Sequence, residues 1–254
     1  MDDYSLLIDL HLEGQRQAPG SDAVTELAVQ LAGLDRSRPL AIADIGSGTG
    51  ASALLLARLL DAQITAVDLL PEFLDELKRR AAGLGVAEQI DTITCSMDEL
   101  PFADAQFDVI WSEGAVYNIG FERGITAWRR FLKPGGLLAV SELSWTTGSR
   151  PAEIERYWEG EYPEIAPASA KIAVLERQGY APVGFFPLPA ACWLEGYYRP
   201  MQERFTDFLA RHGESEAAQA IVADDFSSAA SKGIPVTIPA LGNKSNVSIS
   251  GASQ

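Results

Sequence analysis

The sequence predicts an α/β fold built on a doubly wound, mostly parallel sheet. Short apolar runs alternate with helical patterns from residue 40 to residue 141, and glycine-rich turns lie between several of them. Strands of near-continuous apolar residues are typical of parallel sheets that helices cover on both faces. Because crossovers between such strands are right-handed, a doubly wound sheet is the favoured arrangement.

The expected elements follow one another in a regular order. An amphipathic helix over 2–16 ends at Pro19-Gly20, and Ser21 is placed as the N-cap of a second helix that ends near Gly33. After Ser141 the alternation weakens. Strands are expected over 40–45, 64–67, 90–94, 107–111, 137–141 and 181–188, and helices over 51–60, 71–82, 121–132, 169–178 and in segments up to about residue 225.

The composition limits the kinds of partner. The chain has 254 residues with 20 basic and 35 acidic side chains, giving a net charge of −15. Such a surface repels phosphate backbones and anionic lipids, so we expect a small-molecule partner and neither nucleic acid nor membrane binding. With two cysteines and two histidines, neither a disulfide framework nor a metal site is expected. The acidic start and the short apolar runs predict a cytoplasmic protein.

The turn after the first strand carries the strongest signal for a ligand site. Three glycines lie within 46–50, between a strand and a helix whose free N–H groups favour an anion. Asp68 ends the next strand, where a carboxylate can accept hydrogen bonds from both hydroxyls of a ribose.

The same turn also fits the dinucleotide pattern G-x-G-x-x-A, so a nicotinamide-dependent oxidoreductase is an alternative. Asp44, two residues before the first glycine, is awkward beside a pyrophosphate but suits an ammonium group. No tyrosine has a lysine four residues later, and no phosphate-binding G-x-x-x-x-G-K-[ST] is present.

Residues 43–50 resemble motif I of the class I S-adenosylmethionine-dependent methyltransferases. Matches continue in order through Asp68, the adenine-binding segment 96–102, the fourth strand over 107–111 and the turn at 132–136. The run 111–124 is similar to a narrower subfamily that methylates small molecules, as are residues 145–225. The resemblance implies a Rossmann-like methyltransferase fold with a sheet of the seven-stranded type and S-adenosyl-L-methionine as cofactor.

The resemblance also implies a division of the chain into four parts. Residues 1–34 form N-terminal helices and a lid, 35–144 the cofactor-binding core, and 145–225 a substrate cap with the remaining core elements. Residues 226–254 depart from the subfamily: they contain no acid, two lysines and seven serines. A disordered or atypical tail is favoured, which leaves the final strand open. The alternative is a hairpin from 234–238 and 247–249 that completes the sheet.

The resemblance and the strand-end positions give a set of candidate site residues. The cofactor-binding candidates lie at the strand ends and on the loop before the second helix. Catalytic candidates are Glu113 and Tyr117, and Asn118, Trp145 and Trp193 are candidates for the substrate pocket. The cofactor-binding set is Gln17, Asp44, Gly46, Ser47, Gly48, Gly50, Asp68, Leu69, Met97, Asp98 and Ser112.

Methyl transfer from a sulfonium is an in-line displacement, so holding the acceptor in position can supply most of the acceleration. A base is needed only if the acceptor must first lose a proton. Glu113 is placed to hold a cationic acceptor or to take that proton, and the alternative is a solvated or helix-capping acid. The aromatic residues over 145–198 are read as the core of the cap, some of which also line a pocket for a cation.

Three functions therefore remain open at this point. The first is a methyltransferase (EC 2.1.1.-) acting on a small molecule, and the second is an NAD(P)-dependent oxidoreductase. The third is a non-catalytic paralogue that binds S-adenosylmethionine, since no obligatory base is visible. The sequence leaves the acceptor atom and the oligomeric state open.

Overall fold

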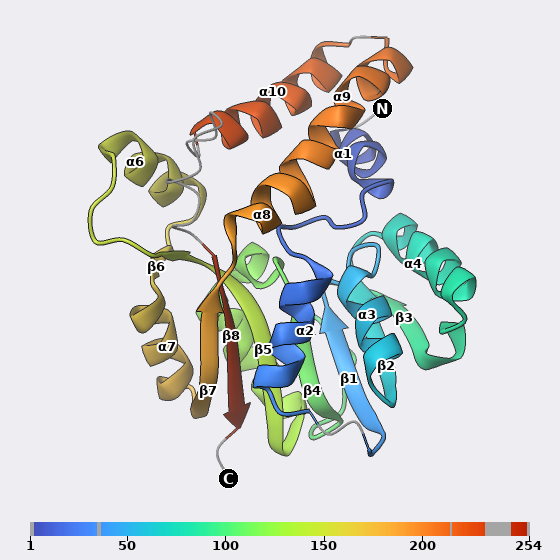
Figure 1. The fold of residues 1–254 in the computed structure, drawn as a ribbon, viewed down its shortest axis with the longest axis vertical. Helices are drawn as coiled ribbons and strands as arrows, with labels where there is room; N and C mark the ends of the chain where they lie inside the picture. Colours follow the sequence, from blue (N-terminus) through green and yellow to red (C-terminus); the bar gives the residue numbers. More distant parts are fainter. Residues whose placement is uncertain (1–2, 35–36, 214, 232–244, 253–254) are drawn as a thin grey trace.

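A computed structural model of the chain describes residues 3–34, 37–213, 215–231 and 245–252. Its strands form a mostly parallel sheet in the order β3-β2-β1-β4-β5-β8-β7, with the short β6 beside β5 (Figure 1). The strands are β1 (Leu40–Ile45), β2 (Ala62–Asp68), β3 (Ile90–Thr94), β4 (Phe107–Ser112), β5 (Leu132–Trp145), β6 (Ala166–Pro167), β7 (Tyr180–Pro187) and β8 (Ser245–Ala252).

Ten α-helices and four short helical turns connect these strands within the described residues. The helices are α1 (Asp3–Leu12), α2 (Asp22–Leu31), α3 (Ala51–Leu59), α4 (Pro71–Leu84), α5 (Phe121–Trp128), α6 (Ala152–Glu161), α7 (Ala168–Arg177), α8 (Ala190–Trp193), α9 (Arg199–Arg211) and α10 (Glu216–Ser231). The turns are η1 (Ala87–Gln89), η2 (Val116–Ile119), η3 (Arg129–Phe131) and the π-helical η4 (Leu194–Tyr198).

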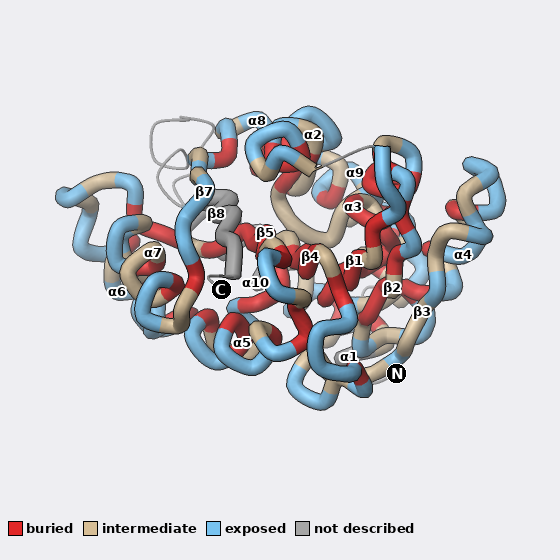
Figure 2. Tube along the Cα trace, turned by 90° about the horizontal axis from the view of Figure 1, so that it is seen from below, coloured by how far each residue is buried: buried red, intermediate tan, exposed pale blue. Residues whose placement is uncertain are grey.

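The sheet is doubly wound, as the sequence predicts, with helices on both faces. Successive residues of its strands therefore bury their side chains in two different core clusters. Ile42 belongs to the core cluster that α2, α3 and α4 form on one face. Ala43 and Ile45 belong to the cluster on the other face, which includes residues of α5 and α7. Figure 2 shows the result, with buried strands between helices whose outer sides are exposed. Strands with two buried faces explain why the sequence shows continuous apolar runs.

The predicted helix boundaries of the core are close to the observed ones. The Ser21 hydroxyl accepts a hydrogen bond from the Val24 backbone N–H and caps α2. Pro71 lies in the first turn of α4, and Gly85 ends that helix with a φ of +71°. Helix α6 has no counterpart among the expected elements, and α1 ends at Leu12 rather than near residue 16.

Helices α1, α9 and α10 lie beyond the carboxyl ends of the parallel strands (Figure 1). A small core holds this layer together, in which Leu6 and Leu10 of α1 belong with Met201 and Phe208 of α9. The layer stands where ligands bind in doubly wound sheets, so these helices form the cover of the site region.

The described part of the C-terminal region is helical and then extended. Helix α10 continues to Ser231, and β8 lies antiparallel between β5 and β7. The segment 247–249 therefore occupies a paired strand, as the hairpin alternative expects for it, rather than a disordered tail. The other hairpin segment, 234–238, lies outside the described residues. The four-part division of the chain stays a prediction.

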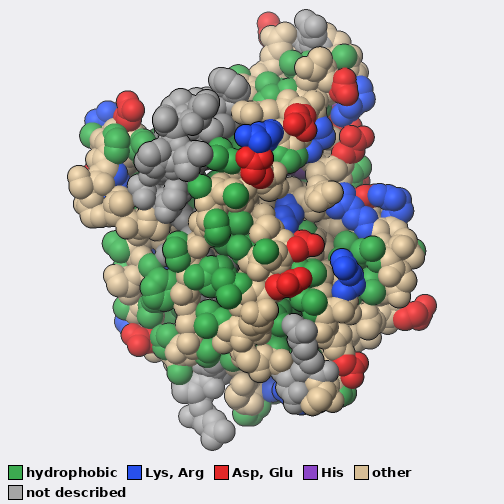
Figure 3. All heavy atoms as spheres, viewed as in Figure 1, with side chains coloured by type: hydrophobic (Ala, Val, Ile, Leu, Met, Phe, Trp, Pro, Cys, Tyr) green, Lys and Arg blue, Asp and Glu red, His purple; other side chains and the backbone are tan. Residues whose placement is uncertain are grey.

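Apolar side chains gather on the face of the molecule that carries α2 and β7 (Figure 3). Leu27 and Leu31 of α2 and Val183 and Phe185 of β7 are the exposed large apolar residues of these elements. In the part of the chain that the structure describes, no helix is long and apolar enough to cross a bilayer.

Candidate functional site

Two cavities adjoin each other at the carboxyl ends of the strands. The first has a volume of about 530 Å³ and the second a volume of about 240 Å³. Because they have wall residues in common, a ligand in one lies next to a ligand in the other. The shared wall consists of Gln17, Ala18, Pro19, Gly114 and Tyr117.

The glycine turn after β1 forms the floor of the first cavity. Gly46 has a φ of +75°, and a Cβ built there would lie 2.3 Å from the Cβ of Ala115. The backbone N–H groups of Gly46 and Ser47 donate to the Val67 carbonyl at 2.8 and 2.9 Å. Gly46, Ser47 and Gly48 line the cavity. Glycine is therefore required at position 46, because a side chain there would collide with Ala115 on a backbone with positive φ.

Gly50 has a different role from the other two glycines of the turn. Its φ is +89°, and a Cβ built there would lie 2.0 Å from Cδ1 of Leu77. It does not line the first cavity. Its missing side chain lets α3 approach α4, and the cofactor role of Gly50 stays a prediction.

Asp44 places a buried carboxyl group beside the turn. The residue is 1% exposed, and its Oδ2 atom has no hydrogen-bond partner among the described residues. Burial, and next the nearby Glu113 carboxylate, raise the pKa of Asp44 to about 8. A buried oxygen without a partner is costly, so the site favours a ligand that supplies a hydrogen-bond donor or a positive charge there.

Asp68 stands at the end of β2 on the opposite side of the turn. Its Oδ2 accepts from the Gly48 N–H at 2.8 Å, and its Oδ1 accepts from the Leu70 N–H at 3.0 Å. Burial raises the pKa of this carboxyl group, while the backbone donors oppose that effect. Each carboxylate oxygen has a further lone pair for a ligand hydroxyl. Leu69, which also lines the cavity, is 55% exposed.

Glu113 lines the first cavity, but its carboxylate is held by three donors. Oε1 accepts from the Thr25 hydroxyl at 2.8 Å and from Trp111 Nε1 at 2.9 Å, and Oε2 accepts from Arg16 Nη1 at 3.1 Å. A carboxylate with these partners connects α2 and the loop before it to β4. The geometry favours a positioning role for Glu113 over the predicted role of a free base.

Arg16 is a site residue that the sequence analysis missed. Its side chain is 9% exposed, and it is the only lysine or arginine among the described residues that line the first cavity. Its guanidinium also contacts Asp22 at 3.0 Å. Nothing in its local sequence distinguishes it from other arginines, because the partner Glu113 lies 97 positions away.

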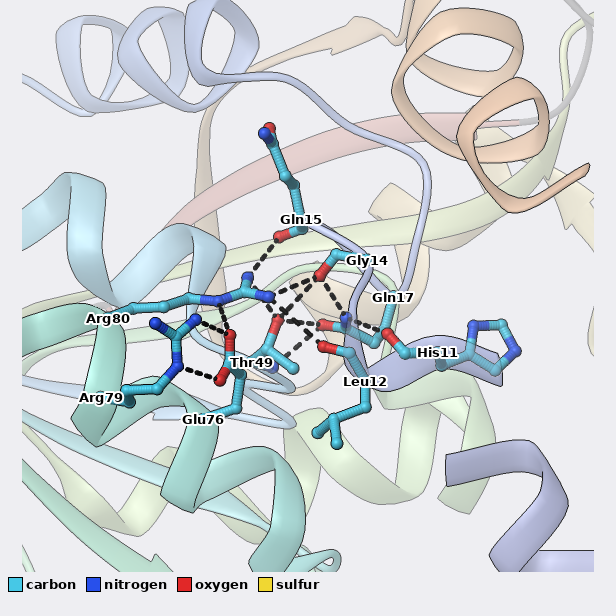
Figure 4. A network of polar contacts seen from close by, with 9 residues as sticks. All are labelled: His11, Leu12, Gly14, Gln15, Gln17, Thr49, Glu76, Arg79 and Arg80. Carbon is cyan, nitrogen blue, oxygen red and sulfur yellow. Dashed lines mark hydrogen bonds and ion pairs between the residues drawn. The ribbon is translucent and has the colours of Figure 1, made fainter. Parts of the chain in front are cut away.

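Gln17 lines both cavities, yet its amide is fully engaged in holding the N-terminal segment over the turn (Figure 4). Its Oε1 accepts from the Thr49 N–H at 2.9 Å, and its Nε2 donates to the carbonyls of His11 and Gly14 at 3.1 Å. Arg80 of α4 completes this clamp with hydrogen bonds to the carbonyls of Leu12, Gly14 and Gln15.

The remaining cofactor candidates separate into two groups. Met97 lines the first cavity, and its carbonyl accepts from Trp128 Nε1 at 3.0 Å. Asp98 and Ser112 lie outside both cavities. Asp98 forms an ion pair with Arg123 at 3.0 Å, and the buried Ser112 hydroxyl donates to the Ile45 carbonyl at 2.8 Å. Both side chains thus have partners within the protein, and their cofactor roles stay predictions.

The predicted acceptor residues are likewise divided. Tyr117 and Asn118 line the first cavity, and Tyr117 and Trp193 line the second. Trp145 lies outside both, in the core cluster of α6 and under the guanidinium of Arg150, which is 4.1 Å from its ring centroid. Its placement is corrected from the pocket to the cap core.

The second cavity holds a buried acid that the sequence analysis missed. Glu142 of β5 is 4% exposed and lines the cavity. Its Oε1 accepts from the Tyr162 hydroxyl at 2.5 Å and from Lys171 Nζ at 2.7 Å. A glutamate next to an otherwise apolar buried strand is the signal that was available. The expected strand ended one residue too early to include it.

His11 of α1 lies apart from both cavities. His11 lines neither of them, and burial lowers its pKa to about 4, while its ring stacks on Tyr197. Across the described ranges, no group of three or more histidine, cysteine, aspartate or glutamate side chains could hold a metal ion.

Comparisons with known proteins identify the central part of the chain. Residues 43–140 match the family model of a methyltransferase domain. A dimethylglycine N-methyltransferase from Parasynechococcus marenigrum is 30% identical over 114 residues, which are 43% of this chain and 41% of that protein. A malonyl-(acyl-carrier protein) O-methyltransferase from Pseudescherichia vulneris is 32% identical over 155 residues, 59% of this chain and 53% of that protein. The chain thus spans about half the length of these curated relatives.

The fold has close counterparts among solved structures. The SAM-dependent methyltransferase from Geobacter sulfurreducens, solved in complex with S-adenosyl-L-homocysteine, superposes with a TM-score of 0.80 at 18% identity, covering 98% of this chain and 96% of that one. Residues 43–140 are therefore similar to a methyltransferase domain, and the chain has the same fold as the Geobacter sulfurreducens protein.

Proposed function

We propose that the protein transfers a methyl group from S-adenosyl-L-methionine to a small-molecule acceptor. The observation that carries the proposal is the pairing of the glycine turn with the unpartnered Oδ2 of Asp44 in the first cavity. A pyrophosphate would bring negative charge to this oxygen, whereas the ammonium group of a methionine moiety would supply the missing donor. The dinucleotide alternative fits this cavity less well for that reason.

The other polar groups of the first cavity fit the remaining parts of the cofactor. Asp68 is placed to accept from ribose hydroxyls, and Arg16 is the cation available to the methionine carboxylate. Met97 and Leu69 offer apolar contacts for the adenine. When bound, the cofactor supplies a methyl group already activated on a sulfonium.

The protein's own part in the reaction is to position two ligands and to exclude water. The two cavities have wall residues in common, so an acceptor in the second cavity would lie next to a cofactor in the first. Holding two reactants in attack geometry can contribute up to roughly 7–11 kcal/mol to the acceleration. Glu113 contributes by holding Arg16 and α2, which flank the loop 17–19 that lines both cavities.

Calorimetry with S-adenosylhomocysteine and with NADH tests the proposal. We expect binding of the former only, and we expect Asp68→Ala to weaken it by about 10- to 100-fold, because charge-assisted hydrogen bonds worth about 1–3 kcal/mol are lost. Asp75→Ala on the exposed side of α4 is the matched control and should bind normally. Preferential binding of NADH, or an unchanged affinity in Asp68→Ala, would overturn the assignment.

Catalysis is tested separately from binding. Incubation with a cofactor that carries a labelled methyl group and with a metabolite extract should transfer the label to a small molecule. Tight binding of S-adenosylhomocysteine without any transfer would instead support a non-catalytic binding protein. The net charge of −15 supports a small-molecule partner, and a cytoplasmic location is part of the same proposal.

A further inference from the structure

Glu142, which lines the second cavity, has a buried carboxylate oxygen without a partner among the described residues. Glu142, Tyr162 and Lys171 form a buried cluster, and their exposed fractions are 4%, 6% and 5%. Both hydrogen bonds of the cluster to Glu142 end on Oε1, whereas Oε2 has no partner among the described residues. Since a buried carboxylate oxygen is costly when it lacks a donor, this geometry points to a ligand that supplies one.

The charges around the cavity select the kind of donor. Among the described residues, Glu142 and Glu161 line it, and no lysine or arginine does. Lys171, which does not line the cavity, forms an ion pair with Oε1 and also lies 4.8 Å from the ring centroids of Phe121 and Tyr162. An anionic ligand would meet two acids and no exposed cation, so the cavity disfavours carboxylates and phosphates.

Much of the remaining wall is aromatic. Rings come from η2, from α6 and the residue after it, from the end of α8 and from η4, a π-helical turn that carries two adjacent tyrosines. Such rings attract a cation through their faces and bury apolar groups, and π-helical turns are frequent at functional sites. The aromatic wall residues are Tyr117, Tyr157, Trp158, Tyr162, Trp193, Tyr197 and Tyr198.

We propose that the second cavity binds the methyl acceptor, and that the acceptor is a small molecule with a protonated amine that donates to Glu142 Oε2 and an apolar body that the aromatic rings enclose. The proposal rests on the proposed methyltransferase function. The volume of about 240 Å³ suits a small molecule.

The electrostatics of the free protein support this assignment. Burial raises the pKa of Glu142, and the lysine and tyrosine partners only partly oppose the effect. The charged form of this group is thus incompletely compensated without a ligand, and an ammonium at Oε2 would complete the compensation.

Three probes with the same phenyl ring and different polar ends test the proposal on the unmodified protein saturated with S-adenosylhomocysteine. They are 2-phenylethylamine, 2-phenylethanol and 3-phenylpropionate, with binding measured by ligand-observed NMR and calorimetry. We expect the amine to bind at least about 10-fold more tightly than the alcohol, and the carboxylate to bind weakest. Equal affinities, or a preference for the carboxylate, would overturn the proposal.

The double variant Glu142→Gln/Lys171→Met connects the selectivity to the buried cluster. It removes both charges together, so the core is not left with an unpaired lysine. We expect it to bind S-adenosylhomocysteine normally and to lose the preference for the amine. Glu161→Gln, which removes an exposed charge from the rim of the same cavity, is the control and should keep that preference.

Repeating the titration without S-adenosylhomocysteine separates the two proposals. If S-adenosylhomocysteine does not bind but the amine does, the proposed methyltransferase function fails and the amine site remains. If the cofactor binds and the amine preference is absent or survives the double variant, only the acceptor proposal fails.

Discussion

The two cavities differ in how the chain builds them. The first is lined largely by short segments that follow β1, β2, β3 and β4, each within a few residues of a strand end. Apart from the shared wall, the second is lined mostly by residues of β5, α6, α8 and η4, which lie between residues 132 and 198 and meet only in the folded chain. A site made at consecutive strand ends leaves a pattern of spacings in the sequence, whereas a site made between distant helices leaves none.

The cavities also use a similar device in different surroundings. Each contains one buried carboxylate oxygen without a partner, Oδ2 of Asp44 in the first and Oε2 of Glu142 in the second. Glu142 has Lys171 beside it at 2.7 Å, while Asp44 has a further acid, Glu113, as the second cause of its raised pKa. The two ligands are therefore expected to differ in how strongly pH controls their binding.

The substitution Gly46→Ala should break the first cavity and spare the second. The new methyl group would lie 2.3 Å from the Ala115 Cβ on a backbone with a φ of +75°, so the turn must move. We expect the affinity for S-adenosylhomocysteine, measured by calorimetry, to fall by about 100-fold or more. Gly83→Ala, where a Cβ meets nothing within 4 Å, is the matched control. Unchanged cofactor affinity would show that the turn is not the binding floor.

Ending the chain after Ser231 should affect the second cavity more than the first. It removes β8, whose Asn246 is paired with Glu142 of β5, and leaves two sheet edges unpaired. We expect the melting temperature to fall by about 10 °C or more, and amine binding to weaken more than cofactor binding. A chain that ends after Ala252 is the control. A melting temperature that barely moves would favour the disordered tail instead.

Glu113→Gln tests the junction between the cavities. The variant loses the charge that pairs with Arg16 and weakens two further hydrogen bonds, so we expect a loss of stability of about 1–3 kcal/mol. Turnover should fall more than cofactor affinity, because the wall that both ligands share is loosened. Denaturant unfolding and labelled-methyl assays measure the two effects, with the exposed Glu153→Gln as control. Normal stability and normal turnover together would make this carboxylate a bystander.

Asp44→Asn should change how stability and binding depend on pH. Because the folded protein holds the pKa of Asp44 at about 8, above its value of 3.8 in an unfolded chain, stability is lost as pH rises from about 4 to about 8. The variant should lack this component, as seen in unfolding curves at several pH values. Below pH 8, binding of an ammonium-bearing ligand to the unmodified protein should release protons, which calorimetry in two buffers detects. Identical pH profiles for the two proteins would contradict the raised pKa.

Much of the core fold was predictable because local signals and tertiary structure agree there. Strands β1 and β3 have the predicted bounds, and Ser21, Pro71 and the glycine turn stand where their capping and turn chemistry requires. Helix α6 was missed, because its charged and aromatic residues show no clear apolar face until Trp158 and Ile154 meet the cap core.

The candidate site was predictable only in part. Asp44, Asp68 and the residues at positions 46–48 follow from spacing along the chain. Gly50, Asp98 and Ser112 satisfy the same spacing but do not line the cavity. Gly50 packs against Leu77, Asp98 pairs with Arg123, and Ser112 donates to the Ile45 carbonyl, and no local pattern reveals these contacts. Arg16 and Glu142 contact partners 97 and 29 positions away along the chain, so only the folded structure could identify them as site residues.

The clamp on the N-terminal segment grips peptide carbonyls and not side chains. Arg80 and the Gln17 amide hold the oxygens at positions 11, 12, 14 and 15, which every amino acid provides. Mutational drift at Leu12 or Gln15 would thus leave the closure of the cavity unaltered while erasing similarity to relatives. In relatives with the same contacts, the N-terminal segment could differ in sequence, and an arginine at the matching position of α4 would still indicate that the segment is held over the turn.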